Sequence, residues 1–96
     1  MAVITAYDLQ GHLGIDVVDE QITTNLERAV NAACRWLSGA VGTFDEADPR
    51  AIDLALIAAA DLYDNRALSG VPGSTVRKMA RDFAMQLRIE GVEEDG

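Results

Sequence analysis

The chain has little of the chemistry that most enzymes and metalloproteins use. Its 96 residues include one cysteine, one histidine and only five aromatic residues (one Trp, two Tyr and two Phe). A single cysteine, Cys34, excludes an internal disulfide, which agrees with a reducing compartment. His12 suits the C-terminal end of a short helix, and no second histidine is present to join it in a metal site. We therefore expect no enzymatic activity, no cofactor and no bound metal.

Long apolar runs are also missing. No stretch of about 18 consecutive apolar residues occurs, so a membrane span is not expected. The opening MAVITAYDLQ lacks the basic flank and apolar core of a signal peptide. We expect the chain to be made and kept in the cytosol. Nor does any segment require a strand.

What is present is a globular composition, with 49% apolar and 25% charged residues. A chain of this length forms one domain with a modest buried fraction. With so few rings, a core of Ala, Leu, Val and Ile indicates close packing between helices. We expect one helical domain over residues 1–90, followed by a short acidic tail over residues 91–96.

The most informative stretch predicts a central helix over about residues 49–68. Asp48 can cap it, and Pro49 suits its first helical position. Apolar residues follow helical spacing and occupy most of the circumference, so the helix needs partners on several sides. The first predicted stripe contains Ile52, Leu56, Ala59 and Tyr63, with Ala55 and Leu62 beside it. The small residues that would admit close neighbours are Ala55, Ala58, Ala59 and Ala60. The fold prediction is all-α, a small bundle of about four helices around this one.

Capping signals predict the other three helices. Thr5 and Asp8 form a capping pair for a helix over residues 6–13. Asp16, Asp19 and Glu20 form the acidic start of a longer helix that we expect to begin near residue 18 or 19 and to end at residue 38, with Gly39 and Gly42 ending it. Ser74 can cap a last helix over about residues 75–90.

Charge is spread unevenly along the chain. The net charge is -8, and residues 1–65 hold eleven acidic and three basic residues, whereas residues 66–96 hold five of each. The last helix carries a basic side made of Arg77, Lys78, Arg81 and Arg88. This side could contact nucleic acid phosphates, pair with an acidic surface of a neighbouring copy, or remain solvated. The acidic total argues against a domain that as a whole binds duplex DNA.

Two aromatic residues are candidates for partner contacts. Trp36 flanks the apolar stripe of the second helix, so it is either a core residue or an interface anchor. Phe44 stands alone among small and acidic neighbours in the following loop. Its side chain either packs over the core of its own chain or is exposed for contact with a partner protein.

The order of these features resembles a known family. A short opening helix (ITAYDLQGHLGID), a long helix with an acidic start (DEQITTNLERAVNAACRWLSG) and an apolar helix (LALIAAADLYDNRAL) are similar to the small head-tail connector proteins of long-tailed bacteriophages and prophages. These are also called adaptor or DNA-packaging proteins. The most specific part of the resemblance is the signature Leu62, Tyr63, Asn65 and Arg66.

The resemblance implies a structural virion protein that is assembled in the bacterial cytoplasm. It would form a homo-oligomeric ring, roughly dodecameric, beneath the phage portal protein. The ring would extend the DNA channel and dock the stopper or tail-completion protein, and DNA would pass without sequence-specific binding. Tyr63 and Arg66 would either stabilise their own helix or fix a neighbouring helix or subunit. The alternative function is a small regulatory or nucleic-acid-binding helical module that uses the basic last helix.

Overall fold

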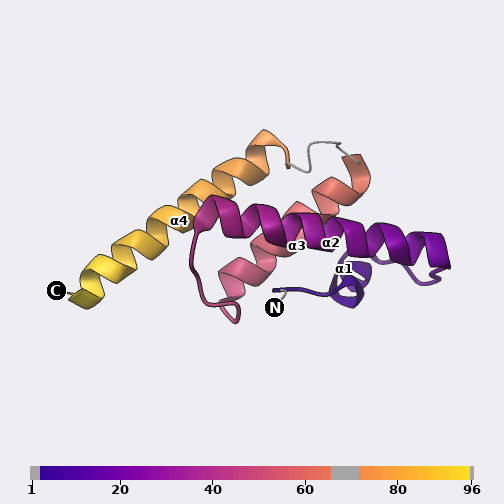
Figure 1. The fold of residues 1–96 in the computed structure, drawn as a ribbon, viewed down its shortest axis with the longest axis horizontal. Helices are drawn as coiled ribbons and strands as arrows, with labels where there is room; N and C mark the ends of the chain where they lie inside the picture. Colours follow the sequence, from indigo (N-terminus) through magenta and orange to yellow (C-terminus); the bar gives the residue numbers. More distant parts are fainter. Residues whose placement is uncertain (1–2, 66–71, 96) are drawn as a thin grey trace.

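Four helices account for most of the chain. The computed structural model describes residues 3–65 and 72–95, and in sequence order the helices are α1 (Ala6–Leu13), α2 (Glu20–Val41), α3 (Pro49–Asn65) and α4 (Ser74–Asp95). No strand occurs within these residues, so the prediction of an all-α bundle is confirmed. The molecule is elongated, with principal extents of 51 × 24 × 19 Å (Figure 1).

α1 begins with the predicted capping pair. The Thr5 hydroxyl accepts a hydrogen bond from the backbone N–H of Asp8 at 3.2 Å, and the Asp8 carboxylate accepts one from the N–H of Thr5 at 2.9 Å. These bonds satisfy backbone donors that the first turn of a helix leaves unpaired. Gly14 ends the helix in the left-handed conformation, with φ of 72°. Leu9 lies at the buried side of this short helix.

α2 is longer than predicted. It begins after Asp19, whose side chain accepts a hydrogen bond from the N–H of Ile22 at 2.8 Å. The predicted last residue, Ser38, is three residues too early, because α2 continues through Gly39 to Val41. Of the two glycines predicted to end the helix, Gly42 does so, with φ of 88°. A glycine inside an exposed helix costs only about 1 kcal/mol relative to alanine. Val41 packs against the core, and this packing favours the extra turn.

α3 contacts each of the other three helices, as expected of a central helix, but α2 does so as well, so the two helices share the centre of the bundle. The Asp48 carboxylate accepts a hydrogen bond from the N–H of Arg50 at 2.9 Å, and Pro49 occupies the first helical position. The buried side of α3 differs from the first predicted stripe, since Ile52, Leu56 and Tyr63 are only half-buried. The buried residues are Ala51, Leu54, Ala55, Ala58, Ala59 and Leu62. Alanines let the helix axes approach closely, so the smallest side chains are covered best and the larger ones flank them.

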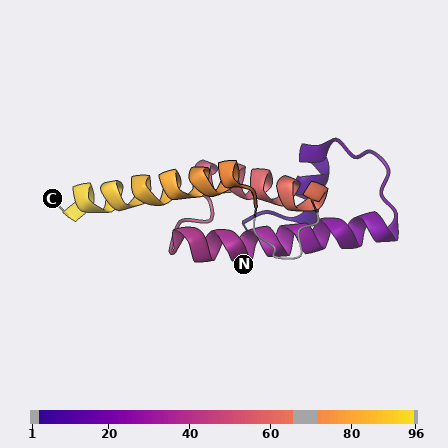
Figure 2. The same ribbon diagram turned by 90° about the horizontal axis from the view of Figure 1, so that it is seen from above.

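α4 crosses the bundle and then leaves it. It starts at Ser74, and the carbonyl of Gly73 accepts a hydrogen bond from the N–H of Arg77 at 3.0 Å. The first half of the helix supplies Val76, Ala80 and Phe83 to the core. The second half projects beyond α2 and α3 (Figure 2). The backbone of residues 91–95, which we expected as a separate tail, continues this helix.

Candidate functional site

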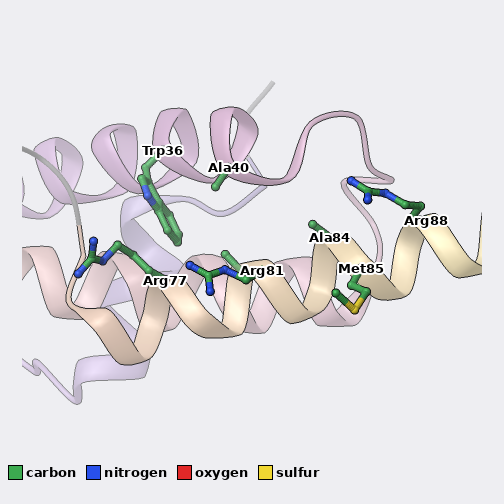
Figure 3. A pocket seen from close by; sticks show the side chains of 8 residues that line it. Trp36, Ala40, Arg77, Arg81, Ala84, Met85 and Arg88 are labelled. Carbon is green, nitrogen blue, oxygen red and sulfur yellow. The ribbon is translucent and has the colours of Figure 1, made fainter.

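A groove lies between the C-terminal half of α2 and residues 77–88 of α4. Its volume is about 430 Å³, and Figure 3 shows most of its side chains. Arginines and apolar residues alternate along it. The lining residues are Trp36, Ala40, Arg77, Ala80, Arg81, Ala84, Met85 and Arg88. The groove therefore combines an apolar floor with three positive charges.

Helical spacing explains why three arginines meet there. Arg77, Arg81 and Arg88 are separated by four and seven residues, which places them on one face of a helix. Lys78 follows Arg77 by one position, a turn of about 100° around the axis, and it does not line the groove. The structure thus separates the predicted basic side into three groove arginines and one lysine elsewhere on the exposed surface of α4.

The groove arginines have no acidic partner in the part of the chain that the structure describes. All three are exposed, and the ion pairs found among residues 3–65 and 72–90 involve Arg50 instead. An exposed arginine is usually solvated, and its contribution to stability is small. Three of them beside an apolar floor form a surface that is suited to carboxylates or phosphates.

Trp36 joins the groove to the core. The residue is half-buried, packs against the core cluster and extends its ring from α2 toward α4 (Figure 3). The two roles considered for Trp36 are therefore not exclusive, since one edge of the ring can be covered while the other lines the groove. Tryptophan in such a position is frequent at protein interfaces.

Phe44 covers the core from the loop between α2 and α3. Its ring meets Phe83 of α4 edge to face, with the centroids 6.1 Å apart and an interplanar angle of 63°. Phe83 is buried, whereas Phe44 is half-buried. Phe44 packs against the core, as the first of its two predicted roles requires, and a contact of its exposed part with a partner stays a prediction.

A cluster around Arg50 ties α4 to the start of α3, and the sequence interpretation missed it. The guanidinium donates to Asp48 at 2.7 and 3.1 Å and to Glu90 at 2.7 and 3.1 Å. Gln86 accepts a further bond at 3.3 Å, and the guanidinium carbon lies 5.2 Å from the centre of the Phe83 ring. No sequence motif could have identified the bond to Glu90, which lies forty positions away.

Hydrogen bonding sets the protonation of this cluster. Bonds from Arg50 lower the pKa of Asp48 and the pKa of Glu90 below their ordinary values. Bonds to Asp48 and Glu90 raise the pKa of Arg50 further above its ordinary value. Since Arg50 and Glu90 are exposed and only Asp48 is half-buried, the cluster mainly defines where α4 lies and adds little net free energy.

The signature residues occupy the end of α3. Leu62 is buried at 6% exposure, and Tyr63 is half-buried against the core. Asn65 is the last residue of α3, and Arg66 lies outside the described residues. Nearby, the Asp61 carboxylate accepts a hydrogen bond from the N–H of Gly73 at 2.8 Å, which holds the start of α4 beside the end of α3. No signal in the sequence pointed to this bond, because its two residues lie twelve positions apart.

An acidic end lies far from the C-terminal half of α4. We define it by residues 16–20, which precede and open α2, and Figures 1 and 2 place the start of α2 and the end of α4 at opposite ends of the long axis. Asp16, Asp19 and Glu20 are exposed there. Val17 is 82% exposed, which is unusual for a branched apolar side chain in a small domain.

Neither a metal site nor a membrane-spanning helix is found in the described ranges. Among residues 3–64 and 72–90, whose side chains the structure describes, no group of three or more His, Cys, Asp or Glu residues is placed to hold a metal ion. None of the helices there combines the length and the apolar character needed to cross a membrane.

Comparison with protein family models, curated proteins and solved structures gave no match. The class that the fold defines is a small all-α bundle, and the surfaces on it are the basis for the functional proposal.

Proposed function

We propose that this chain is a head-tail connector subunit of a long-tailed bacteriophage or prophage. In this role it forms a ring beneath the portal protein, extends the DNA channel and joins the capsid to the tail. It is a structural component of the virion and performs no catalysis. Its partners are copies of itself, the portal protein above the ring and a stopper or tail-completion protein below it.

The observation that supports this proposal best is the presence of two different charged surfaces at separate places. Arg77, Arg81 and Arg88 line one groove, and the acidic end, residues 16–20, lies away from it. A ring built from identical subunits needs two unlike surfaces that fit each other, because each subunit contacts its neighbours through opposite sides. A bundle with both surfaces meets this requirement.

The remaining acidity suits a channel for DNA. Residues 1–65 carry a charge of -8, of which Asp16, Asp19 and Glu20 supply three negative charges, and in a ring the remaining five would face the central passage. Like charge prevents phosphates from binding tightly, so DNA would slide without sticking and without sequence-specific contacts.

Reconstitution with the portal protein encoded in the same genome tests the proposal. The purified chain and the portal protein are mixed, separated by size exclusion and examined by light scattering and negative-stain electron microscopy. The expected result is a portal complex of increased mass with an added ring on one side. A portal particle unchanged in mass and shape, with the chain eluting separately, would contradict the proposal.

A second candidate function is supported by the same groove. Three arginines beside Trp36 could bind nucleic acid through phosphate contacts and stacking of a base on the indole ring. A salt-dependent affinity for DNA, lost when Arg77, Lys78 and Arg81 are replaced by Gln, would favour this regulatory or nucleic-acid-binding module over the connector. Absence of binding at low salt would exclude it.

A further inference from the structure

We propose that the basic groove between α2 and α4 receives the acidic end, residues 16–20, of a second copy of this chain. This inference rests on the proposed function in one respect, namely that copies associate head to tail. It adds the segment that docks, the groove that receives it and the chemistry of the contact.

The groove supplies charge and an apolar floor. Arg77, Arg81 and Arg88 project along one side of α4, and none of them bonds to an acidic group among the described residues. Trp36 and Met85 provide apolar surface in the same groove, and Met85 is 56% exposed. The side chain of methionine adapts its shape to a partner, and the indole ring offers a rigid contact. A matching segment would carry carboxylates on both sides of an apolar residue.

The acidic end has this composition. Asp16 precedes Val17, and Asp19 and Glu20 follow it closely. Val17 is 82% exposed, so its burial in a groove would remove apolar surface from water. One oxygen of Asp19 accepts the hydrogen bond from the N–H of Ile22, and its second oxygen remains available to an arginine.

Geometry makes the contact intermolecular. The start of α2 points away from α4 in both orientations of the ribbon (Figures 1 and 2), so the acidic end cannot reach the groove of its own chain. A contact between two unlike surfaces leaves the pair with one free groove on one copy and one free acidic end on the other. Such contacts continue from copy to copy and close into a ring only at a suitable rotation.

A second copy suits the groove better than nucleic acid does. The chain carries a net charge of -8, and this overall charge repels a polyanion even where three arginines are clustered. A second copy carries the same net charge, but its acidic end brings only a few carboxylates to the groove, and the exposed Val17 among them adds an apolar contact that a phosphate backbone lacks. Electrostatic attraction between such patches accelerates association and selects the orientation.

Two neutralised variants test the contact. The groove variant carries Arg81→Gln and Arg88→Gln, and the end variant carries Asp16→Asn and Glu20→Gln. Asp19 is left unchanged because it caps α2. Neutral substitutions are chosen so that the two altered surfaces do not attract each other. Lys78→Gln serves as the matched control, since Lys78 lies on α4 but does not line the groove.

The masses of the full chain and of each variant are measured by sedimentation equilibrium at low salt, where charge contacts are screened least. Circular dichroism checks that each variant remains helical. We expect the unmodified chain and the Lys78→Gln variant to self-associate, and each double variant to do so about tenfold more weakly. An equimolar mixture of the two double variants should form a one-to-one complex, because one intact groove and one intact acidic end remain.

Several results would overturn the inference. The first is that both double variants self-associate as strongly as the unmodified chain. The second is that the equimolar mixture of the two double variants stays monomeric. The third is that the unmodified chain is itself monomeric at every concentration. DNA binding that is lost in the groove variant, while self-association is kept, would assign the groove to nucleic acid instead. Portal binding is measured separately. A ring on the portal without the one-to-one complex would refute this contact alone, and the complex without portal binding would refute the connector function alone.

Discussion

Arg50 and Glu90 are forty positions apart in the sequence and form a two-bond ion pair. The bonds measure 2.7 and 3.1 Å. They join the first turn of α3 to the half of α4 that extends beyond the bundle, and Asp48 holds the same guanidinium from the other side. Arg50 therefore fixes the angle at which α4 leaves the core, and with it the position of one wall of the groove.

Replacing Arg50 with Ala should loosen the projecting half of α4. Exposed ion pairs contribute little to global stability, so we expect only a small drop in melting temperature. The larger effect is local, and hydrogen exchange of residues 86–95 should accelerate while exchange in α2 and α3 stays unchanged. Arg81→Ala is the control, because Arg81 makes no ion pair among the described residues. Equal exchange rates in the two variants would contradict this role of Arg50.

The same cluster predicts how stability depends on pH. The pKa values of Asp48 and Glu90 are lower in the folded chain than their ordinary values of 3.8 and 4.5. In acid the unfolded chain therefore binds protons before the folded chain does, and the free energy of unfolding falls as pH falls. This contribution is complete above the ordinary values and is lost as pH drops through the folded ones.

Urea unfolding measured from neutral pH down to about pH 3 tests this dependence. Glu90→Gln should flatten the acid slope, whereas Glu27→Gln, on the exposed side of α2, should leave it unchanged. An acid slope that is equally steep in the Glu90→Gln variant would show that the pair does not contribute to it.

Phe83 should be the most costly of the aromatic residues to truncate. It is 5% exposed, and it packs against Phe44 and beneath Arg50. Phe83→Ala should lower the free energy of unfolding by about 3–5 kcal/mol through lost burial and the cavity left behind. Phe44→Ala should cost clearly less because Phe44 is only half-buried. Chemical denaturation compares the two, and an equal cost would mean that the core does not depend on α4 as described.

Much of the fold was predictable from local signals. Three features were correctly predicted: the capping pair of Thr5 and Asp8, the start of α3 at Asp48 and Pro49, and the burial of the alanine-rich α3 against other helices. Each depends on neighbours within a few residues or on periodicity. Helix caps and apolar periodicity depend on residues that are close together in the sequence, so both can be recognised without knowledge of the tertiary structure.

The predictions from the sequence differ from the structure at places where packing between helices determines the local conformation or burial. Gly39 is a helix breaker by composition, yet α2 passes through it because Val41 gains packing beyond it. The first predicted stripe of α3 favoured its larger residues, whereas close packing buried its alanines. The bond from Arg50 to Glu90 and the place of Trp36 beside the arginines join distant segments, which periodicity does not reveal.

Two glycines give a paired prediction about helix ends. Gly39 lies inside α2, and no other segment comes within 4 Å of the place where a Cβ would lie, so Gly39→Ala should stabilise the chain by about 0.5–1 kcal/mol. Gly14 also has open space around it but ends α1 at φ of 72°. Gly14→Ala should therefore destabilise by about 1–2 kcal/mol. Melting temperatures that shift in the same direction for both variants would contradict the assignment of these two positions.

The connector assignment is tested most directly by native mass spectrometry of the chain mixed with the portal protein of its own genome. The account predicts a complex in which a fixed, roughly dodecameric set of chains is bound to one portal oligomer, with no partially filled species at saturation. A spectrum that contains only free chain and unmodified portal would contradict it.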